Sequence, residues 1–345
     1  MPPEPPTTAP APEPGATAPA TPEPGATAPA TPEPGATAPA TPEPGSPTPT
    51  PSTDPATDTF IAHRNLLFTV AYEMLGSAAD AEDVLQETWL RWVKVDLGQV
   101  NDQRAYLVRI TTRQALNRLR TMSRRKEAYV GEWLPEPLLT APDVAEDVEL
   151  AESISMALML VLETLSPTER AVFVLREVFD TGYDEIAAAV DKSPAAVRQI
   201  AHRARRHVDA RRPRHSVSPD ESRAVLESFQ RVLETGDPQT LLAVLAPDVV
   251  MVNDGGGIKQ AALRPISGAE KVARFLVGAL GKNTSPVTVA PTEVNGGFAL
   301  RVSLGGVLDG ILAMRVEDAR VTGLYYVRNP EKLTRAETET PLTLR

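Results

Sequence analysis

The chain has 345 residues, 34 of them proline, no cysteine, and a formal net charge of −10 at pH 7. The lack of cysteine excludes disulfides and thiolate metal sites, and the four histidines show no metal-ligand spacing, so we expect no metal and no cofactor. Because no apolar run reaches the length of a membrane span and the N-terminus lacks a signal-peptide pattern, we expect a cytoplasmic protein that contacts no membrane.

Residues 1–58 predict a disordered tail. Residues 1–57 hold 20 of the 34 prolines, and the decapeptide TPEPGATAPA repeats through them. Proline-rich repeats without an apolar stripe form no core. Residues 1–59 also carry seven acidic and no basic side chains, so most of the net charge belongs to the tail. We interpret the tail as a spacer, since the repeat lacks an aromatic or basic anchor for a partner.

Residues 59–126 predict a helical module. Order is expected to begin at Phe60, in an amphipathic helix that Gly76 ends, and Ser77 is placed to cap the next helix. Four polar residues of that second helix share one face by their spacing. They are Asp80, Asp83, Gln86 and Glu87. This face is either solvated acidic surface or a docking surface for a basic partner.

A third helix is predicted from Gln103 to about Thr121, with apolar residues at alternating spacings of three and four. Its opposite side carries Arg109, Arg113, Asn117 and Arg120. A basic helix face of this kind suits the phosphates and base edges of nucleic acid. The linker that follows, residues 127–148, contains the stiff apolar motif WLPEP at residues 133–137, which favours a docking peptide over a local packing role.

Residues 149–213 predict a second helical module that ends in a helix-turn-helix. Ser166 begins a capping box, and Thr181 and Ser193 are the expected caps of the last two helices. The final helix presents Arg198, Gln199, His202 and Arg203 opposite a buried apolar stripe. This arrangement is typical of a DNA recognition helix, and an ordinary hairpin with a solvated basic face is the alternative.

Residues 217–335 predict an α+β domain, and residues 336–345 a flexible tail. Two helices are followed by five alternating apolar runs, which glycine pairs separate as in hairpins, with a helix between the first two runs. The predicted strands are 249–253, 286–294, 298–304, 307–316 and 320–327. The loop from Asp254 to Gly257 is not a nucleotide-binding loop, because no Lys-Ser/Thr ending or helix follows it.

Residues 60–208 resemble an extracytoplasmic-function (ECF) sigma factor. The motif AADAEDVLQETWLRW resembles the helix that docks on RNA polymerase, and RAYLVRITTRQALNRLR the part that opens the minus-10 element. LSPTERAVFVLREVFDTGYDEIAAAVDKSPAAVRQIAHRARR resembles the helix-turn-helix that reads the minus-35 element. The resemblance implies that core RNA polymerase and promoter DNA are the partners.

Residues 218–333 extend the resemblance to ECF sigma factors of group 41, which carry a fused SnoaL-like cone domain of the nuclear transport factor 2 type. The matching motifs are WLPEP, NDGGG with LRPISGAEKVARFL, and YVRNPEKL. Two departures are Ile258, inserted before Lys259, and Glu331 in place of the usual aspartate. A fused domain of this kind replaces a separate inhibitor, so the sequence implies no such partner.

We expect the C-terminal domain to contact the linker and both DNA-binding modules. Trp133 is a large apolar side chain in a polar linker, and three glycines after Asp254 let another backbone approach closely. The residues expected at the junction are Trp133, Leu134, Pro135, Asp254, Gly255, Gly256, Gly257, Lys259, Asn329 and Pro330. Such contacts would modulate the activity of the sigma factor.

Two other functions fit part of the sequence. A one-component regulator with a helix-turn-helix and a ligand-binding domain would explain residues 165–335 but not the acidic docking helix. An enzyme would use the SnoaL-like domain, with Asp254 as a base. No histidine or second acid is placed to assist Asp254, so we expect no catalytic residue.

Overall fold

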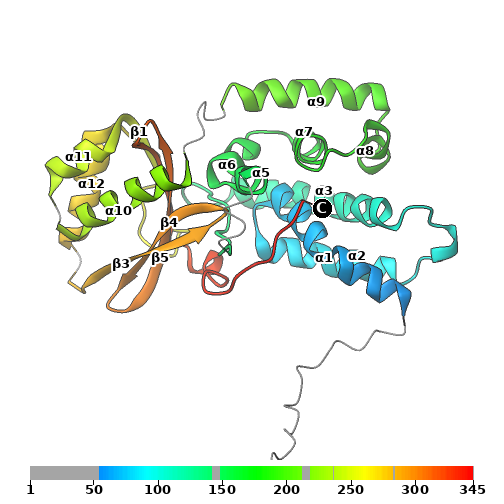
Figure 1. Cartoon of the computed structure of the whole chain (residues 1–345), viewed down its shortest axis with the longest axis horizontal. Helices are drawn as coiled ribbons and strands as arrows, with labels where there is room; N and C mark the ends of the chain where they lie inside the picture. Colours follow the sequence, from blue (N-terminus) through cyan, green and yellow to red (C-terminus); the bar gives the residue numbers. More distant parts are fainter. Residues whose placement is uncertain (1–53, 142–147, 212–217, 236, 283, 345) are drawn as a thin grey trace, which may run out of the picture. The chain divides into compact units, whose positions relative to one another are not determined.

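The computed structural model of the protein describes residues 54–141, 148–211 and 218–344, except 236 and 283 (Figure 1). The predicted tail up to residue 53, part of the predicted linker and the domain boundary at residue 213 lie outside the described residues. Their assignment therefore stays a prediction.

The first helical module contains α1 (Pro55–Leu75), α2 (Ala78–Trp92), η1 (Leu97–Gln99) and α3 (Gln103–Glu127). α1 begins five residues before the predicted start at Phe60, because the Asp54 side chain caps it and proline follows. Gly76 ends α1 in the left-handed conformation (φ 68°), as predicted, and Ser77 accepts from the Asp80 N–H to cap α2.

The second helical module contains α5 (Val148–Ile154), α6 (Met156–Glu163), α7 (Pro167–Phe173), η2 (Val174–Val178), α8 (Tyr183–Val190) and α9 (Pro194–Asp209). The Ser166 capping box and the Ser193 cap are confirmed. The predicted Thr181 cap is wrong, because α8 begins after Gly182 without a side-chain cap. The Thr181 backbone is instead drawn into the preceding turn, where its N–H donates to the Leu175 carbonyl at 2.9 Å.

The C-terminal domain is α+β, as predicted. Its helices α10 (Pro219–Thr235), α11 (Pro238–Val244) and α12 (Ala269–Lys282) pack on a six-stranded sheet with strand order β2-β1-β6-β5-β4-β3 (Figure 1). The strands are β1 (Leu245–Asp254), β2 (Ile266–Ser267), β3 (Val287–Val294), β4 (Gly297–Leu304), β5 (Val307–Glu317) and β6 (Arg320–Val327). β1 pairs with β6 in parallel and the other pairs are antiparallel, so the ends of β1 and β6 place residues 254 and 328 together.

One hydrophobic core runs through both helical modules. α3 also packs against α8, and the Arg113 guanidinium donates to the Ala188 carbonyl at 2.7 Å. Arg170 of α7 is 1% exposed and donates to the Glu73 carbonyl at 2.9 Å and to the Glu163 carboxylate at 2.7 Å. The two modules are therefore joined by packing and by buried polar contacts.

The buried side-chain carboxyl of Glu73 makes the stability of the fold sensitive to pH. Burial raises the pKa of the Glu73 carboxyl to about 8, although Ser153 and Arg170 oppose the change. The protonated Glu73 carboxyl is favoured in the folded state, so its contribution to stability is fully present below pH 4.5, the pKa in the unfolded chain. This contribution is lost as the pH rises through about 8, the pKa in the folded state. We expect Glu73→Gln to remove that loss. Between these two pH values the variant should therefore gain on the wild type by roughly 1.4 kcal/mol for each tenfold fall in proton concentration.

Heat unfolding of the full chain at a series of pH values checks this expectation. Glu227→Gln, an exposed change on α10, is the control and should follow the wild type. Parallel curves for Glu73→Gln and the wild type across this range would contradict the assignment of the buried proton to Glu73.

The last described residues differ from the flexible tail that the sequence predicts. Leu342 is 9% exposed and belongs to the core of the helical modules. The Thr343 N–H donates to Thr69 of α1 at 3.2 Å, and the Thr340 N–H donates to the Leu139 carbonyl at 2.9 Å. Residues 336–344 thus follow the linker and α1, because Leu342 is buried in the helical core and the Thr340 and Thr343 backbone binds these two segments.

Candidate polymerase, promoter and interdomain surfaces

The acidic face of α2 is mostly open. Asp83, Gln86 and Glu87 are exposed, as predicted for a docking surface. Asp80 is a correction, because it is only 6% exposed and its carboxylate accepts from the Arg118 Nε at 2.6 Å. The salt bridge takes Asp80 out of the surface, which leaves three of the four predicted residues for a partner.

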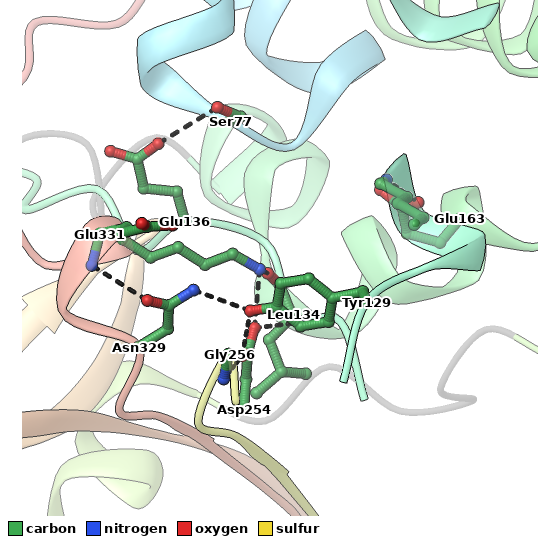
Figure 2. Close-up of polar contacts among 11 residues, drawn as sticks. Ser77, Tyr129, Leu134, Glu136, Glu163, Asp254, Gly256, Asn329 and Glu331 are labelled. Atoms are coloured by element: carbon green, nitrogen blue, oxygen red, sulfur yellow. Dashed lines mark hydrogen bonds and ion pairs between the residues drawn. The ribbon is translucent and has the colours of Figure 1, made fainter. Parts of the chain in front are cut away.

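The first turn of α2 is held by the linker. The Glu136 carboxylate accepts from the Ala78 N–H at 2.7 Å and from the Ala79 N–H at 3.3 Å. It also accepts from the Ser77 hydroxyl at 3.4 Å (Figure 2). These amides have no partner inside the helix, so Glu136 completes the cap from 58 residues away. Burial raises the pKa of Glu136, and the backbone donors at the helix start oppose this change.

The basic face of α3 is partly engaged. Asn117 and Arg120 are exposed, whereas the Arg109 guanidinium lies 4.6 Å from the ring centroid of Tyr106. Arg113 donates to the Ala188 carbonyl of α8. The structure therefore brings the second module onto the α3 face that the sequence predicts for DNA.

The recognition helix α9 has the predicted division of faces. Its buried side is formed by Val197, Ile200, Ala201, Ala204 and Val208. Arg198, Gln199, His202 and Arg203 are all exposed. This face is open to a DNA groove, although the Arg198 guanidinium also lies 5.5 Å from the ring centroid of Tyr183 in α8.

Asp254 is the centre of the junction between the C-terminal domain and the linker. Figure 2 shows Tyr129, Leu134 and Asn329 grouped around its carboxylate. One oxygen accepts from the Tyr129 hydroxyl at 2.5 Å and from the Gly256 N–H at 3.1 Å. The other accepts from the Leu134 N–H at 2.9 Å and from the Lys332 ammonium at 2.7 Å. Asp254 is fully buried and both oxygens are occupied, so it is a structural anchor and not a free base.

Lys332 closes the same junction from the C-terminal side. Its ammonium donates to the Leu134 carbonyl at 2.6 Å and lies 3.3 Å from the ring centroid of Trp133. Burial lowers the pKa of Lys332 to about 8, although the Asp254 carboxylate opposes this change. Leu134 is 0% exposed, and both its backbone groups are bound by the C-terminal domain. Pro135 is buried beside it.

The glycine loop allows a close approach, as predicted. A side chain at Gly256 (φ 63°) would lie 2.4 Å from Asn329, and one at Gly257 would lie 3.1 Å from Val130. A side chain at Gly255 would collide with the Lys259 carbonyl, so the tight turn that follows Asp254 needs glycine at this position. Asn329 is 1% exposed and donates to the Tyr129 hydroxyl at 2.8 Å.

Two residues of the predicted junction act locally instead. The Lys259 ammonium pairs with Asp309 of β5 at 3.0 Å, inside the C-terminal domain, so its predicted contact with the linker is wrong. Pro330 starts η3 (Pro330–Lys332), a single turn that aims Lys332 at the linker. The inserted Ile258 is 57% exposed.

A second junction is not predicted by the sequence. Asn295, in the β3–β4 turn, donates to the Tyr72 hydroxyl of α1 at 2.6 Å and to the Ile154 carbonyl of α5 at 2.9 Å. Its side-chain oxygen accepts from the Leu138 N–H of the linker at 3.0 Å. One side chain thus contacts both helical modules and the linker.

The residues that form these junctions differ in how far the sequence points to them. Glu136 and Lys332 lie inside the motifs WLPEP and YVRNPEKL, so the motifs were a usable signal. Asn295 precedes a glycine pair that predicts only a hairpin, and Tyr72 and Tyr129 sit in ordinary helical and linker sequence. Nothing local distinguishes those three from surface or core residues.

Comparison with known proteins identifies the two helical modules. Residues 59–125 match the model of sigma-70 region 2, and residues 155–208 match that of sigma-70 region 4. The chain is 38% identical to the ECF RNA polymerase sigma factor SigJ of Mycobacterium tuberculosis over 290 residues, which cover 80% of this chain and 92% of that protein. The chain belongs to the ECF sigma factor family. As such it binds core RNA polymerase and promoter DNA and directs promoter recognition.

Two further similarities extend over the C-terminal domain. The probable ECF sigma factor SigI of the same organism is 32% identical, over 81% of this sigma factor and 95% of SigI. The crystal structure of Mycobacterium tuberculosis SigJ superposes with a TM-score of 0.65 at 32% identity, covering 83% of this chain and 100% of that one. The family assignment decides against both a one-component regulator and an enzyme.

The described residues offer neither a metal site nor a membrane span. Among them, no group of three or more His, Asp or Glu side chains is arranged to hold a metal ion. In the same part of the chain, no helix combines the length and the apolar character that crossing a membrane requires.

Proposed function

We propose that this sigma factor docks on core RNA polymerase through the α2 face formed by Asp83, Gln86 and Glu87, and that its C-terminal domain modulates initiation through the linker. The acidic face is open, and it would repel DNA while attracting a basic protein surface. We expect this activity in the cytoplasm, without a separate inhibitor.

The observation that carries the proposal is that the C-terminal domain binds both backbone groups of Leu134. Asp254 accepts from the Leu134 N–H, and Lys332 donates to the Leu134 carbonyl. Two residues later, Glu136 caps the polymerase-docking helix. A change in the C-terminal domain therefore reaches α2 through two residues of linker.

Promoter contact would use the exposed residues of α9 for the upstream element and α3 for the downstream one. The two elements lie apart along the duplex, whereas α3 and α8 are in contact through Arg113 and Ala188. Binding both elements together requires this contact to open. Because the linker joins the modules, a C-terminal domain that holds the linker can oppose or permit that opening.

Transcription with purified core polymerase tests the proposal. We expect the full chain to give promoter-specific transcripts, and two truncations to change their amount in different ways. Removal of everything after residue 213 loses the domain that holds the linker. Removal of residues 334–345 keeps Asp254 and Lys332 at the linker and loses only the last segment, which contacts α1 and Leu139. Trp133→Ala, which removes the ring beneath Lys332, should also change the yield.

The outcomes separate the parts of the proposal. No promoter-specific transcript from any form would contradict initiation by this chain. Equal yields from the full chain, both truncations and Trp133→Ala would show that the C-terminal domain is only tethered. Phe298→Leu, in β4 of the same domain and outside the junction, serves as a control for general damage to that domain.

A further inference from the structure

The segment before the helix-turn-helix contains one turn of π-helix, η2. The Phe179 N–H donates to the Val174 carbonyl five residues back at 3.3 Å, which inserts an extra residue into the helical repeat. The wider turn presents the neighbouring side chains Arg176 and Glu177 to the helix-turn-helix. Glu177 binds Arg205 of α9 through two contacts, of 2.9 Å and 2.5 Å.

Arg176 holds the first residue of α8. Its guanidinium lies 4.9 Å from the ring centroid of Tyr183 and pairs with Asp180 at 2.9 Å. It also donates to the Thr181 carbonyl at 3.1 Å. Arg176 therefore packs against the Tyr183 ring, and its contacts with Asp180 and Thr181 fix the position of the guanidinium.

A second guanidinium approaches the same ring from the recognition helix. Arg198 lies 5.5 Å from the Tyr183 ring centroid, and its side chain is otherwise exposed. A free arginine side chain loses rotamer freedom when it binds a base, and a ring contact made beforehand reduces that loss. Tyr183 is half-buried, so its ring can serve as a fixed platform.

We propose that Tyr183 is a positioning residue for promoter recognition, whose ring orients the Arg198 guanidinium toward the bases of the upstream element. The inference rests on the proposed use of α9 in reading that element. Tyr183 would then affect the recognition of one base without contacting it. The π-turn would also have a function, because it places Arg176 against the Tyr183 ring.

The test uses holoenzyme made from the full chain and core polymerase, with a DNA library randomised across the upstream element as the probe. Transcribed sequences report the base preference at each position. Tyr183→Phe keeps the ring and should match the wild type. Tyr183→Leu should lower the preference at the one position that Arg198→Ala affects by about 2- to 5-fold, the size of an exposed cation–π contact.

A double variant separates positioning from a general effect on the helix. If Tyr183 acts through Arg198, Tyr183→Leu should add nothing to Arg198→Ala at that position. Tyr106→Leu removes the same kind of ring contact from Arg109 in α3 and should leave the upstream preference unchanged. Base preference is measured per transcribed molecule, so a smaller folded fraction does not imitate the expected result.

Four results would overturn the inference. A uniform loss of transcription at all positions in Tyr183→Leu would indicate a structural role, and full additivity with Arg198→Ala would indicate an independent contact. A Phe variant that behaves like the Leu variant would assign the effect to the hydroxyl. A wild-type holoenzyme without any upstream preference would overturn the proposed role of α9 and the inference with it.

Discussion

Reversing the charges of Asp83 and Glu87 together should lower the affinity of the sigma factor for core RNA polymerase by at least about 100-fold. Both side chains are exposed on one face of α2, and lysine there would meet a basic partner surface with like charge. The fold should remain, because Asp83 loses only a surface salt bridge with Arg118, which is worth about 0–1 kcal/mol.

Binding of fluorescently labelled core polymerase to the purified variant measures the effect, with heat unfolding as the check on folding. The matched control reverses Glu227 and Glu234, two exposed acids of α10 that lie on the C-terminal domain. It carries the same change in net charge. If the Asp83/Glu87 variant forms holoenzyme like the wild type, α2 does not dock on the polymerase through this face.

Lys332→Met should destabilise the linker junction by about 3–5 kcal/mol, because the buried Asp254 carboxylate would lose its cation. Asp254 is 0% exposed and pairs with Lys332 at 2.7 Å. The methionine side chain fills similar space but cannot donate to the Leu134 carbonyl. We expect the linker to leave its site and become open to protease.

The double variant Asp254→Asn with Lys332→Met tests the reason for that loss. It removes both charges, so part of the stability should return relative to Lys332→Met alone. Heat unfolding and the rate of protease cleavage near Trp133 measure the two effects. A single variant as stable and as protected as the wild type would show that the ion pair does not hold the linker.

The two junctions together give the C-terminal domain a hydrogen-bonded connection to the polymerase-docking helix. Asn295 donates to the Tyr72 hydroxyl, which donates to the Glu136 carbonyl at 2.7 Å, and the Glu136 carboxylate caps α2. The Glu136 N–H also donates to the Gly76 carbonyl at 2.9 Å. Removing the Tyr72 hydroxyl would break this connection without touching the acidic face.

The elements of this protein follow from local sequence. The periodicity of apolar residues, the Ser166 and Ser193 caps, and the glycine pairs between strands each act over a few residues, and they place β3 to β6 within one residue of their observed bounds. β1 starts four residues earlier than predicted, α3 ends about six residues later, and β2 was not predicted. The exposed face of α9 was predictable for the same reason, since one apolar stripe defines the opposite side of a helix.

Where local signals compete, tertiary contacts decided the outcome. Asp80 has the spacing of a surface residue, but Arg118 of another helix takes its carboxylate. Thr181 has the chemistry of a cap, but the π-turn uses its backbone and Gly182 takes the position. Lys259 follows the glycine loop, but its ammonium pairs with Asp309 of β5.

The sequence alone therefore determined the two sigma modules, the α+β domain, and the part of the junction that lies within motifs, such as Trp133 and Asp254. Only the tertiary structure determined which groups bind one another there: the Glu136 cap on α2, the Asn295 contacts and the pair of Lys332 with Asp254. The physical reason is the separation along the chain between the groups that interact. Caps and apolar stripes are satisfied by neighbours a few residues away, whereas a buried charge or amide takes whichever partner the fold brings to it, here up to 223 residues along the chain.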